Sequence, residues 1–184
     1  DKFTFYNRAL TDALLVASYN SIGDGMPKGP LAPTGPNLIA SLSSAILTPV
    51  KGENPNPTDS GYLLCRKARQ LLHLNDSFIL DTEAALAHAY DGKTVVFIDD
   101  FVGSGDQFLY TWKTIDKSGR SFEKASEKSK FTALYITLIT TDFGLQKIND
   151  YAPTVAVCAT HVVESKSALQ GVLKSAPNMR SPIL

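Results

Sequence analysis

Long apolar runs constrain the fold of this chain more than any other feature of its sequence. The clearest lies at residues 94–98, and similar runs occupy residues 45–50, 131–140 and 154–159. The segments between them carry apolar residues at helical spacing. A strand that is apolar on both faces has to be covered on both faces, which is typical of parallel sheets. The sequence therefore predicts an α/β fold, a doubly wound and mainly parallel sheet with helices on both faces.

Other segments complete this arrangement. Residue patterns predict helices at residues 5–20, 37–44, 59–73, 82–90, 107–115 and 141–150, and a short strand at 77–80. Residues 21–36 hold four prolines and four glycines, which predicts a surface loop. Residues 117–130 hold five basic and two acidic side chains and are predicted to be a solvated loop. We find no repeat or linker, so we expect one domain over residues 1–184, with residues 1–44 preceding the core sheet.

The composition limits the classes of partner. The 184 residues carry 18 basic and 18 acidic side chains, and this balance argues against binding of nucleic acid by bulk charge. A negatively charged ligand must therefore be held by local geometry. We find no apolar run of the length that spans a bilayer, so no membrane partner is expected. Two cysteines, Cys65 and Cys158, predict neither a zinc site nor a disulfide framework, which is typical of a cytoplasmic protein.

Residues 95–107 carry most of the chemical information in the sequence. Four apolar residues lead to Asp99 and Asp100, and a Gly-Ser-Gly turn centred on Ser104 then enters a helix. Glycines allow the backbone to approach a ligand closely, and the start of a helix favours negative charge. These features predict a phosphate site. The two carboxylates before it are suited to sugar hydroxyls or to a hydrated magnesium ion, so the pattern favours a ribose 5-phosphate.

This segment resembles the signature of the type I phosphoribosyltransferases, in which two acidic residues follow an apolar strand and precede a phosphate loop. The resemblance implies that Asp99 and Asp100 contact the ribose hydroxyls of phosphoribosyl pyrophosphate and hold Mg²⁺. The phosphate loop would consist of Gly103, Ser104, Gly105, Asp106 and Gln107. The implied reaction is the transfer of phosphoribose to a nitrogenous acceptor, with displacement of pyrophosphate.

A second, softer resemblance concerns the loop after the predicted strand at 45–50. In the family, the loop after an early strand binds pyrophosphate, largely through backbone amides. The segment from Lys51 to Gly61 stands in that place, and Lys51, Ser60 and Gly61 are its candidate ligand-binding residues.

Three positions depart from the family pattern. Gly103 stands where one purine-using branch has a catalytic aspartate, and Gly103 has no proton to supply. Asp106 places a carboxylate in the phosphate loop, which weakens phosphate binding unless it turns away or shares a cation. Gln107 replaces a hydroxyl donor. These departures are typical of a divergent branch, such as the phosphoribosyltransferase-like domains of bacterial conflict and antiphage systems.

Several interpretations stay open at this point. A strand that ends in two aspartates also resembles the Walker B motif, but the sequence contains no GxxxxGK[ST] phosphate loop. An ordinary glycine-rich turn is a purely structural alternative. The main functional alternative is a nucleotide-binding sensor or effector that does not turn its ligand over, or that acts only with a protein partner or a second copy of the chain. Among the histidines, only His161 follows a predicted strand at the ligand edge.

Overall fold

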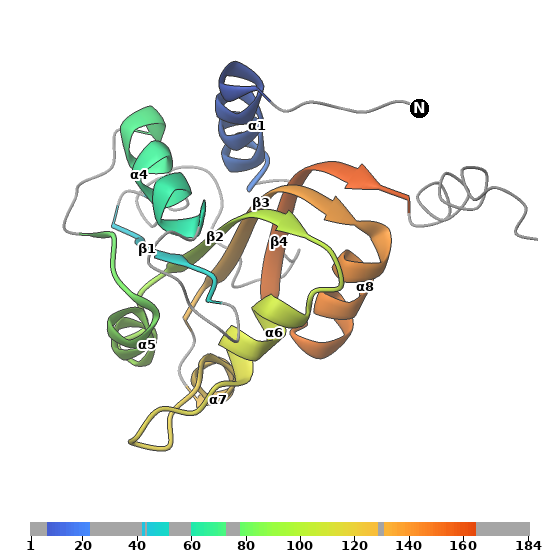
Figure 1. The fold of residues 1–184 in the computed structure, drawn as a ribbon. Coiled ribbons are helices and arrows are strands. Elements are labelled where there is room, and N and C mark those ends of the chain that lie inside the picture. Colours follow the sequence, from blue (N-terminus) through green and yellow to red (C-terminus); the bar gives the residue numbers. More distant parts are fainter. Residues whose placement is uncertain are drawn as a thin grey trace, which may run out of the picture.

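A single parallel sheet forms the centre of the molecule. The computed structural model describes residues 7–22, 42, 44–51, 60–72, 78–128 and 131–164. Its four strands lie in the order β1-β2-β3-β4 (Figure 1). They are β1 (Ile46–Pro49), β2 (Val95–Val102), β3 (Ala133–Thr141) and β4 (Val155–Val163). The predicted α/β fold with a parallel sheet is confirmed. Most of the predicted helix at 37–44 and most of the predicted loops at 21–36 and 51–58 lie outside the described residues.

The order in which the chain adds strands to the sheet reverses at β1. On one edge of β1, the Ile46 amide donates to the Thr94 carbonyl at 2.9 Å, next to β2. On the other edge, the Leu80 amide donates to the Leu47 carbonyl at 2.9 Å, and Ile79 forms a parallel bridge with Leu47. The segment after β1 thus lies on one side of it and β2 on the other. Ligands of open α/β sheets bind at the carboxyl ends of strands beside such a switch.

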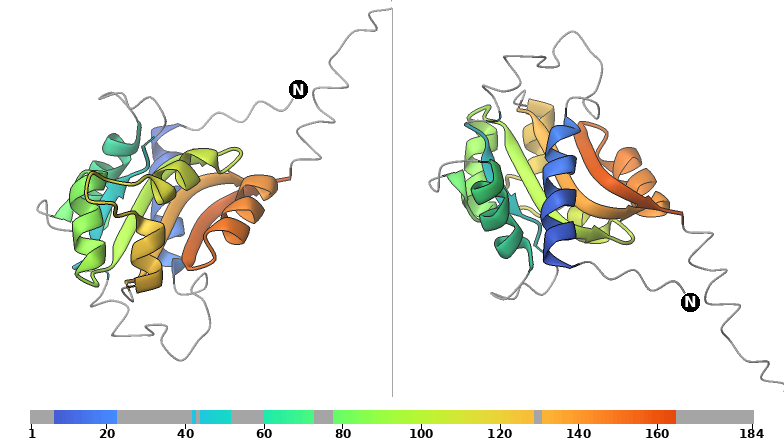
Figure 2. Two further views of the ribbon diagram at one scale, coloured as in Figure 1. Left: turned by 90° about the horizontal axis from the view of Figure 1, so that it is seen from below. Right: turned by 90° about the horizontal axis from the view of Figure 1, so that it is seen from above.

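Helices cover both faces of the sheet (Figure 2). Leu15 of α1 (Arg8–Asn20) and Leu64 of α4 (Ser60–Leu72) pack on one face, against Val96 and Ile98 of β2. The other face is covered by α5 (Thr82–Tyr90), α6 (Asp106–Lys113), α7 (Phe122–Lys128) and α8 (Asp142–Tyr151). Burial of the apolar residues on both faces explains why the strands read as continuous apolar runs.

Aromatic packing fixes α6 against β2. The ring of Phe97 lies edge-on to those of Phe108 and Phe122, with centroids 5.4 and 4.8 Å apart. Trp112 stacks on Phe108 one turn along α6. Edge-to-face and offset contacts of this kind add to the gain from burying the rings. They hold the two ends of residues 103–105, the loop that joins β2 to α6.

Some elements differ from their predicted extent. Residues 117–130 are not wholly a solvated loop, because they contain α7, whose Phe122 and Ala125 are buried. Their spacing of three residues puts both on one helical face, while the charged residues take the other. The strand predicted at 94–98 continues to Val102, and the last strand continues to Val163 and includes His161. In the described residues, no helix has the length and apolar character needed to cross a bilayer.

Candidate functional site

The carboxyl end of β2 holds a buried carboxylate. Asp99 is 6% exposed, and the hydroxyl of Tyr135 in β3 donates to its Oδ2 atom at 3.0 Å. Its Oδ1 atom accepts from the backbone amide of Asp100 at 2.9 Å. Tyr135 pairs with Phe97 across the two strands, and Asp99 is two residues further along β2. Residues two apart on a strand point to the same face, so Tyr135 can reach Asp99. The sheet thus fixes the position of this carboxylate from two directions.

Burial changes the acidity of this carboxyl group. Burial, as the largest cause, and the neighbouring Asp100 carboxylate together raise the pKa of Asp99 to about 7, against the lowering effect of the hydrogen bonds from Tyr135 and the Asp100 amide. Burial also raises the pKa of Tyr135 well above its ordinary value, so that its hydroxyl stays a donor. Asp99 therefore titrates near neutral pH, and a cation or a hydroxyl donor beside it favours the ionised form.

A glycine-rich loop follows β2 and is anchored to α8. Gly105 precedes α6 with a φ of 80°, and a Cβ atom there would lie 3.0 Å from the Gly144 carbonyl oxygen. The Thr141 hydroxyl donates to the Gly103 carbonyl and also accepts from the Gly144 amide. A Cβ atom on Gly144 would lie 2.3 Å from the Gly103 oxygen. Glycine is therefore needed at both contacts, one for conformation and one for close approach.

Asp99 and the loop line one cavity at the sheet edge, which we call the loop cavity. It has a volume of about 210 Å³. Its wall includes the predicted residues Asp99, Gly103, Ser104, Gly105, Asp106 and Gln107, together with Tyr135. The first residues of α6 and a buried carboxylate thus border the same space. Such a space suits a ligand that carries both an anion and hydroxyl groups.

Asp106 is paired with a lysine. Its Oδ1 atom accepts from the ammonium group of Lys147 at 2.6 Å, and its Oδ2 atom accepts from the Ser104 hydroxyl at 2.6 Å. Both hydrogen bonds lower the pKa of Asp106. The carboxylate therefore shares a cation, the condition under which a carboxylate in this loop is compatible with phosphate. Sequence reasoning missed Lys147, which lies on the helix after the next strand.

Asp100 lines a different space from Asp99. Residues alternate between the two faces of a strand, and Asp100 borders a groove of about 550 Å³ on the face covered by α1 and α4. Arg8, Lys67 and Phe101 line the same groove. The structure therefore does not place both carboxylates in the loop cavity.

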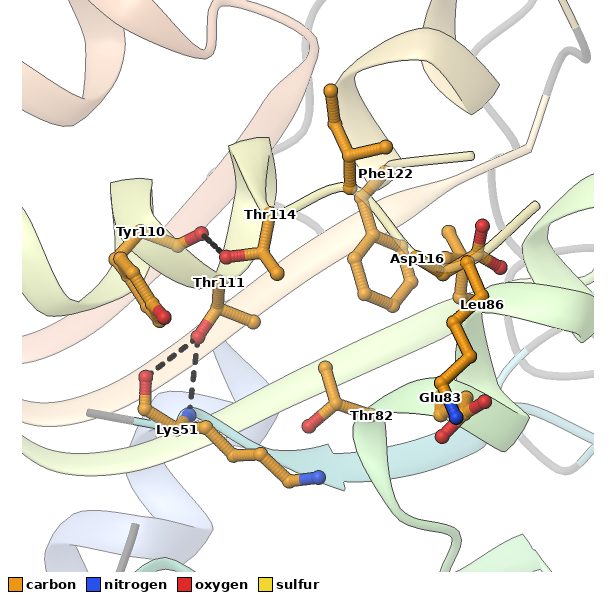
Figure 3. Close-up of a pocket in the computed structure, with 11 residues that line it drawn as sticks. Lys51, Thr82, Glu83, Leu86, Tyr110, Thr111, Thr114, Asp116 and Phe122 are labelled. Atoms are coloured by element: carbon orange, nitrogen blue, oxygen red, sulfur yellow. Dashed lines mark hydrogen bonds between the residues drawn. The ribbon is translucent and has the colours of Figure 1, made fainter. Parts of the chain in front are cut away.

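Lys51 lines a third cavity, of about 320 Å³, between α5 and α6 (Figure 3). Its backbone is held by the Thr111 hydroxyl, which accepts from the Lys51 amide at 3.1 Å and donates to the Lys51 carbonyl at 2.9 Å. In Figure 3 its side chain extends toward Thr82, whose buried hydroxyl has no hydrogen-bond partner among the described residues. Lys51 therefore does not line the loop cavity.

The other two predicted pyrophosphate residues lie at the start of α4. Ser60 and Gly61 are its first residues, and a Cβ atom on Gly61 would lie 2.8 Å from the Pro49 side chain at the end of β1. Gly61 thus allows the start of α4 to approach the strand end closely. Residues 52–59, the centre of the predicted pyrophosphate loop, lie outside the described residues.

The donor set is compatible with a magnesium ion that also takes ligands from a substrate. Within the described part of the chain, no three His, Cys, Asp or Glu side chains form a metal-binding group. Mg²⁺ keeps several waters and binds through one or two carboxylates plus substrate phosphates, so one carboxylate in the loop cavity is enough. Asp99 can supply it, whereas Asp100, the other predicted ligand, lines the groove on the other face of β2.

One family model and solved structures match this chain. The model of the PRTase-CE family matches residues 1–177. No curated protein matches the sequence. Among solved structures, the AQ2163 protein from Aquifex aeolicus aligns with a TM-score of 0.50 and 13% identity, covering 84% of this chain and 76% of that one. Orotate phosphoribosyltransferase from Aeropyrum pernix aligns with a TM-score of 0.46 and 12% identity, covering 89% and 74%.

Proposed function

The chain belongs to the PRTase-CE family, and on that premise we propose that it binds phosphoribosyl pyrophosphate or a related nucleotide with magnesium and transfers phosphoribose to a nitrogenous acceptor. The observation that carries this proposal is the loop cavity, which Asp99 and residues 103–107 line together. One end of the cavity offers the Asp99 carboxylate, which suits sugar hydroxyls, and the other offers the start of α6, which suits a phosphate.

In the proposed complex, each end of the loop cavity has its own task. The Asp99 carboxylate accepts hydrogen bonds from the ribose hydroxyls, and Tyr135 holds that carboxylate in place. The 5-phosphate lies at the start of α6, where backbone amides donate to it and the Ser104 hydroxyl turns from Asp106 to donate to it. Lys147 compensates the negative charge of Asp106 beside the phosphate. The loop is pre-formed because Thr141 and Gly144 anchor its backbone, so little ordering is required on binding.

The transfer step needs positioning more than a nucleophile from the protein. The acceptor nitrogen forms a bond to C1 of the ribose while the bond from C1 to the pyrophosphate oxygen breaks. Pyrophosphate leaves with the electron pair, and the acceptor releases its proton to solvent. Positive charge develops on the ribose ring, and fixed carboxylates near the ring stabilise it. Magnesium held by Asp99, the predicted metal ligand that lines the loop cavity, would supply charge neutralisation for the leaving group.

Calorimetry with phosphoribosyl pyrophosphate and Mg²⁺ tests this assignment. We expect binding to the wild type, and binding at least about tenfold weaker in Asp99→Asn and in Ser104→Ala, because each removes a charged or hydroxyl contact. Asp91→Asn, at the exposed end of α5, is the matched control and should bind like the wild type. Equal heats from all four proteins, or no binding by any of them, would overturn the proposal.

The second candidate function is a sensor or partner-regulated effector that binds the nucleotide without turning it over. Two observations favour it: Gly103 offers no proton, and the Ser104 hydroxyl is already bonded to Asp106. Resemblance to conflict-system domains supports a cytoplasmic role in antiphage defence. Nucleotide-dependent thermal stabilisation without release of pyrophosphate in the presence of nitrogenous bases would favour the sensor, whereas rapid release would favour the transferase.

A further inference from the structure

The cavity between α5 and α6, which we call the helix cavity, is separate from the loop cavity. Its volume of about 320 Å³ falls in the range of about 300–1,000 Å³ that is typical of small-molecule pockets. Its wall comes from the end of β1, the first half of α5, the last part of α6 and the segment that leads into α7. Among the described residues, it shares none with the loop cavity.

Apolar side chains form much of the wall of the helix cavity. Leu86 and Phe122 line it and belong to the buried core. Tyr110 and Ile115 also line it, and their side chains are 45% and 58% exposed. An exposed apolar surface that adjoins the core gains from being covered by an apolar group. The helix cavity therefore suits a ligand with an apolar body.

Two polar side chains of the helix cavity lack partners. The Thr111 hydroxyl holds the Lys51 backbone, and Figure 3 shows the Lys51 side chain extending toward Thr82. Within the described part of the chain, the Lys51 ammonium has no ion pair and the buried Thr82 hydroxyl has no hydrogen bond. Threonine in a helix populates two χ1 rotamers, so this hydroxyl can turn into the cavity that Thr82 lines. Both groups can donate to one ligand oxygen.

The charges around the helix cavity do not balance. Lys51, Lys117, Glu83 and Asp116 line it, and Asp116 is already paired with Arg120 at 2.9 Å. The other three have no ion pair with a described residue and leave an excess of one positive charge. A ligand with one negative charge restores the balance. A phosphate, with a second charge, would leave one charge uncompensated beside apolar walls, which is unfavourable.

We propose that the helix cavity binds a small organic monocarboxylate with an apolar body. The carboxylate lies between the Lys51 ammonium and the Thr82 hydroxyl, and the apolar body covers Ile115 and Tyr110. Lys51 thereby has a role other than the pyrophosphate contact that the sequence predicts. The inference does not depend on the proposed function, because the helix cavity and the loop cavity have separate walls.

Ligand-observed NMR with matched probes tests the class of ligand. The probes are phenylacetate and hexanoate, the neutral phenylacetamide and hexanamide, and acetate, which has the charge but almost no apolar body. We expect at least one of the two larger carboxylates to bind the wild type. Its amide and acetate should bind at least about tenfold more weakly. Equal binding of the carboxylate and its amide, or no binding of either larger carboxylate, overturns the proposal.

Variants of the wall locate the bound carboxylate. Lys51→Met and Thr82→Val should each weaken its binding about tenfold or more, because each removes a donor. Glu83→Gln should strengthen its binding about twofold to threefold, because it removes a like charge at an exposed position. Thr82→Val should not lower the melting temperature of the free protein, since its hydroxyl has no partner to lose.

Lys93→Met is the matched control, because Lys93 is exposed and does not line the helix cavity. It should bind the carboxylate like the wild type. Affinity that is unchanged in both Lys51→Met and Thr82→Val, or that falls equally in Lys93→Met, overturns the assignment.

Two further probes separate this site from the proposed function. Inorganic pyrophosphate should not displace the carboxylate, and displacement that is lost in Lys51→Met would overturn the proposal in favour of a pyrophosphate contact. Ribose 5-phosphate should bind whether or not the carboxylate is present. If ribose 5-phosphate binds and no carboxylate binds, only the helix-cavity assignment fails. If a carboxylate binds with the expected variant pattern and ribose 5-phosphate does not bind, only the proposed sugar-phosphate site fails.

Discussion

Asp99 and Asp100 are adjacent and identical in sequence, yet they belong to two different regions of the molecule. Asp99 lies on the side of β2 that faces α6, buried beside Tyr135 and the phosphate loop. Asp100 lies on the side that faces α1 and α4, in an open groove with Arg8. A step of one residue along β2 therefore places the two carboxylates on opposite faces of the sheet. Asp99 has a raised pKa and a fixed partner, whereas Asp100 borders a second space.

This difference shows how a linear motif can serve two spaces. The sequence pattern predicts one diol-binding pair, but an extended strand directs consecutive side chains to opposite faces. The loop cavity is anchored from outside the motif by hydrogen bonds from residues of β3 and α8. The groove is lined by side chains from helices far away in the sequence. Variants on each side of β2 should therefore affect different properties.

The largest expected effect comes from the backbone contact that holds the loop cavity. Gly144→Ala would place its Cβ atom 2.3 Å from the Gly103 oxygen and 3.0 Å from the Val102 side chain. Because the obstacle is backbone, the loop must move, and we expect a loss of about 2–3 kcal/mol in the free energy of unfolding. Chemical denaturation measures it. Asn149→Ala, exposed on the same helix, should change stability by less than about 0.5 kcal/mol. Wild-type stability of Gly144→Ala would show that the loop is not anchored there.

The next largest effect is on the pH dependence of the free energy of unfolding, which distinguishes the two carboxylates. The folded pKa of Asp99 is about 7, whereas an unfolded aspartate has a pKa of about 4. Between these values the folded state holds a proton that the unfolded state has released, so the free energy of unfolding falls as pH rises through this window. Asp99→Asn cannot ionise and lacks this fall. We expect its stability relative to the wild type to increase by about 1–3 kcal/mol between about pH 5 and about pH 8.

Asp100→Asn is the matched comparison for the pH experiment, because it changes the same side chain on the other side of the strand. It should keep a fall in stability with rising pH, since Asp99 remains buried. Denaturation curves at several pH values decide the matter. A parallel pH dependence in the wild type and in Asp99→Asn contradicts the assignment of the raised pKa to the loop cavity.

The smallest expected effect concerns charge at the mouth of the loop cavity. Asp106→Asn removes a carboxylate from the phosphate loop and leaves Lys147 unpaired there, so ribose 5-phosphate should bind about threefold to tenfold more tightly. Lys147→Met should weaken binding by a similar factor. Both effects should shrink at high salt, because the pair is exposed. Titration calorimetry at low and high salt measures them, and Asp150→Asn on α8 provides a control. Unchanged affinities would show that the phosphate does not approach Asp106.

The sequence predicted those parts of the site that are contiguous in the chain. Five residues of the loop cavity, Gly103 to Gln107, follow one another, and their residue types alone indicate an anion site after a strand. The sequence does not show the placement of Asp100, because a polar pair after four apolar residues indicates the end of a strand. The strand in fact continues to Val102, paired with β3 through Phe101 and Val102, and this continuation fixes which face each aspartate takes.

The sequence by itself determined the fold class and the glycine-rich loop after β2, because apolar periodicity and glycine positions act over short distances along the chain. Only the tertiary structure decided which partners reach that loop. Tyr135, Thr141 and Lys147 come from β3 and α8, and Arg8 comes from the first helix. Their roles depend on strand order and helix packing, which bring residues from distant parts of the chain to one edge of the sheet.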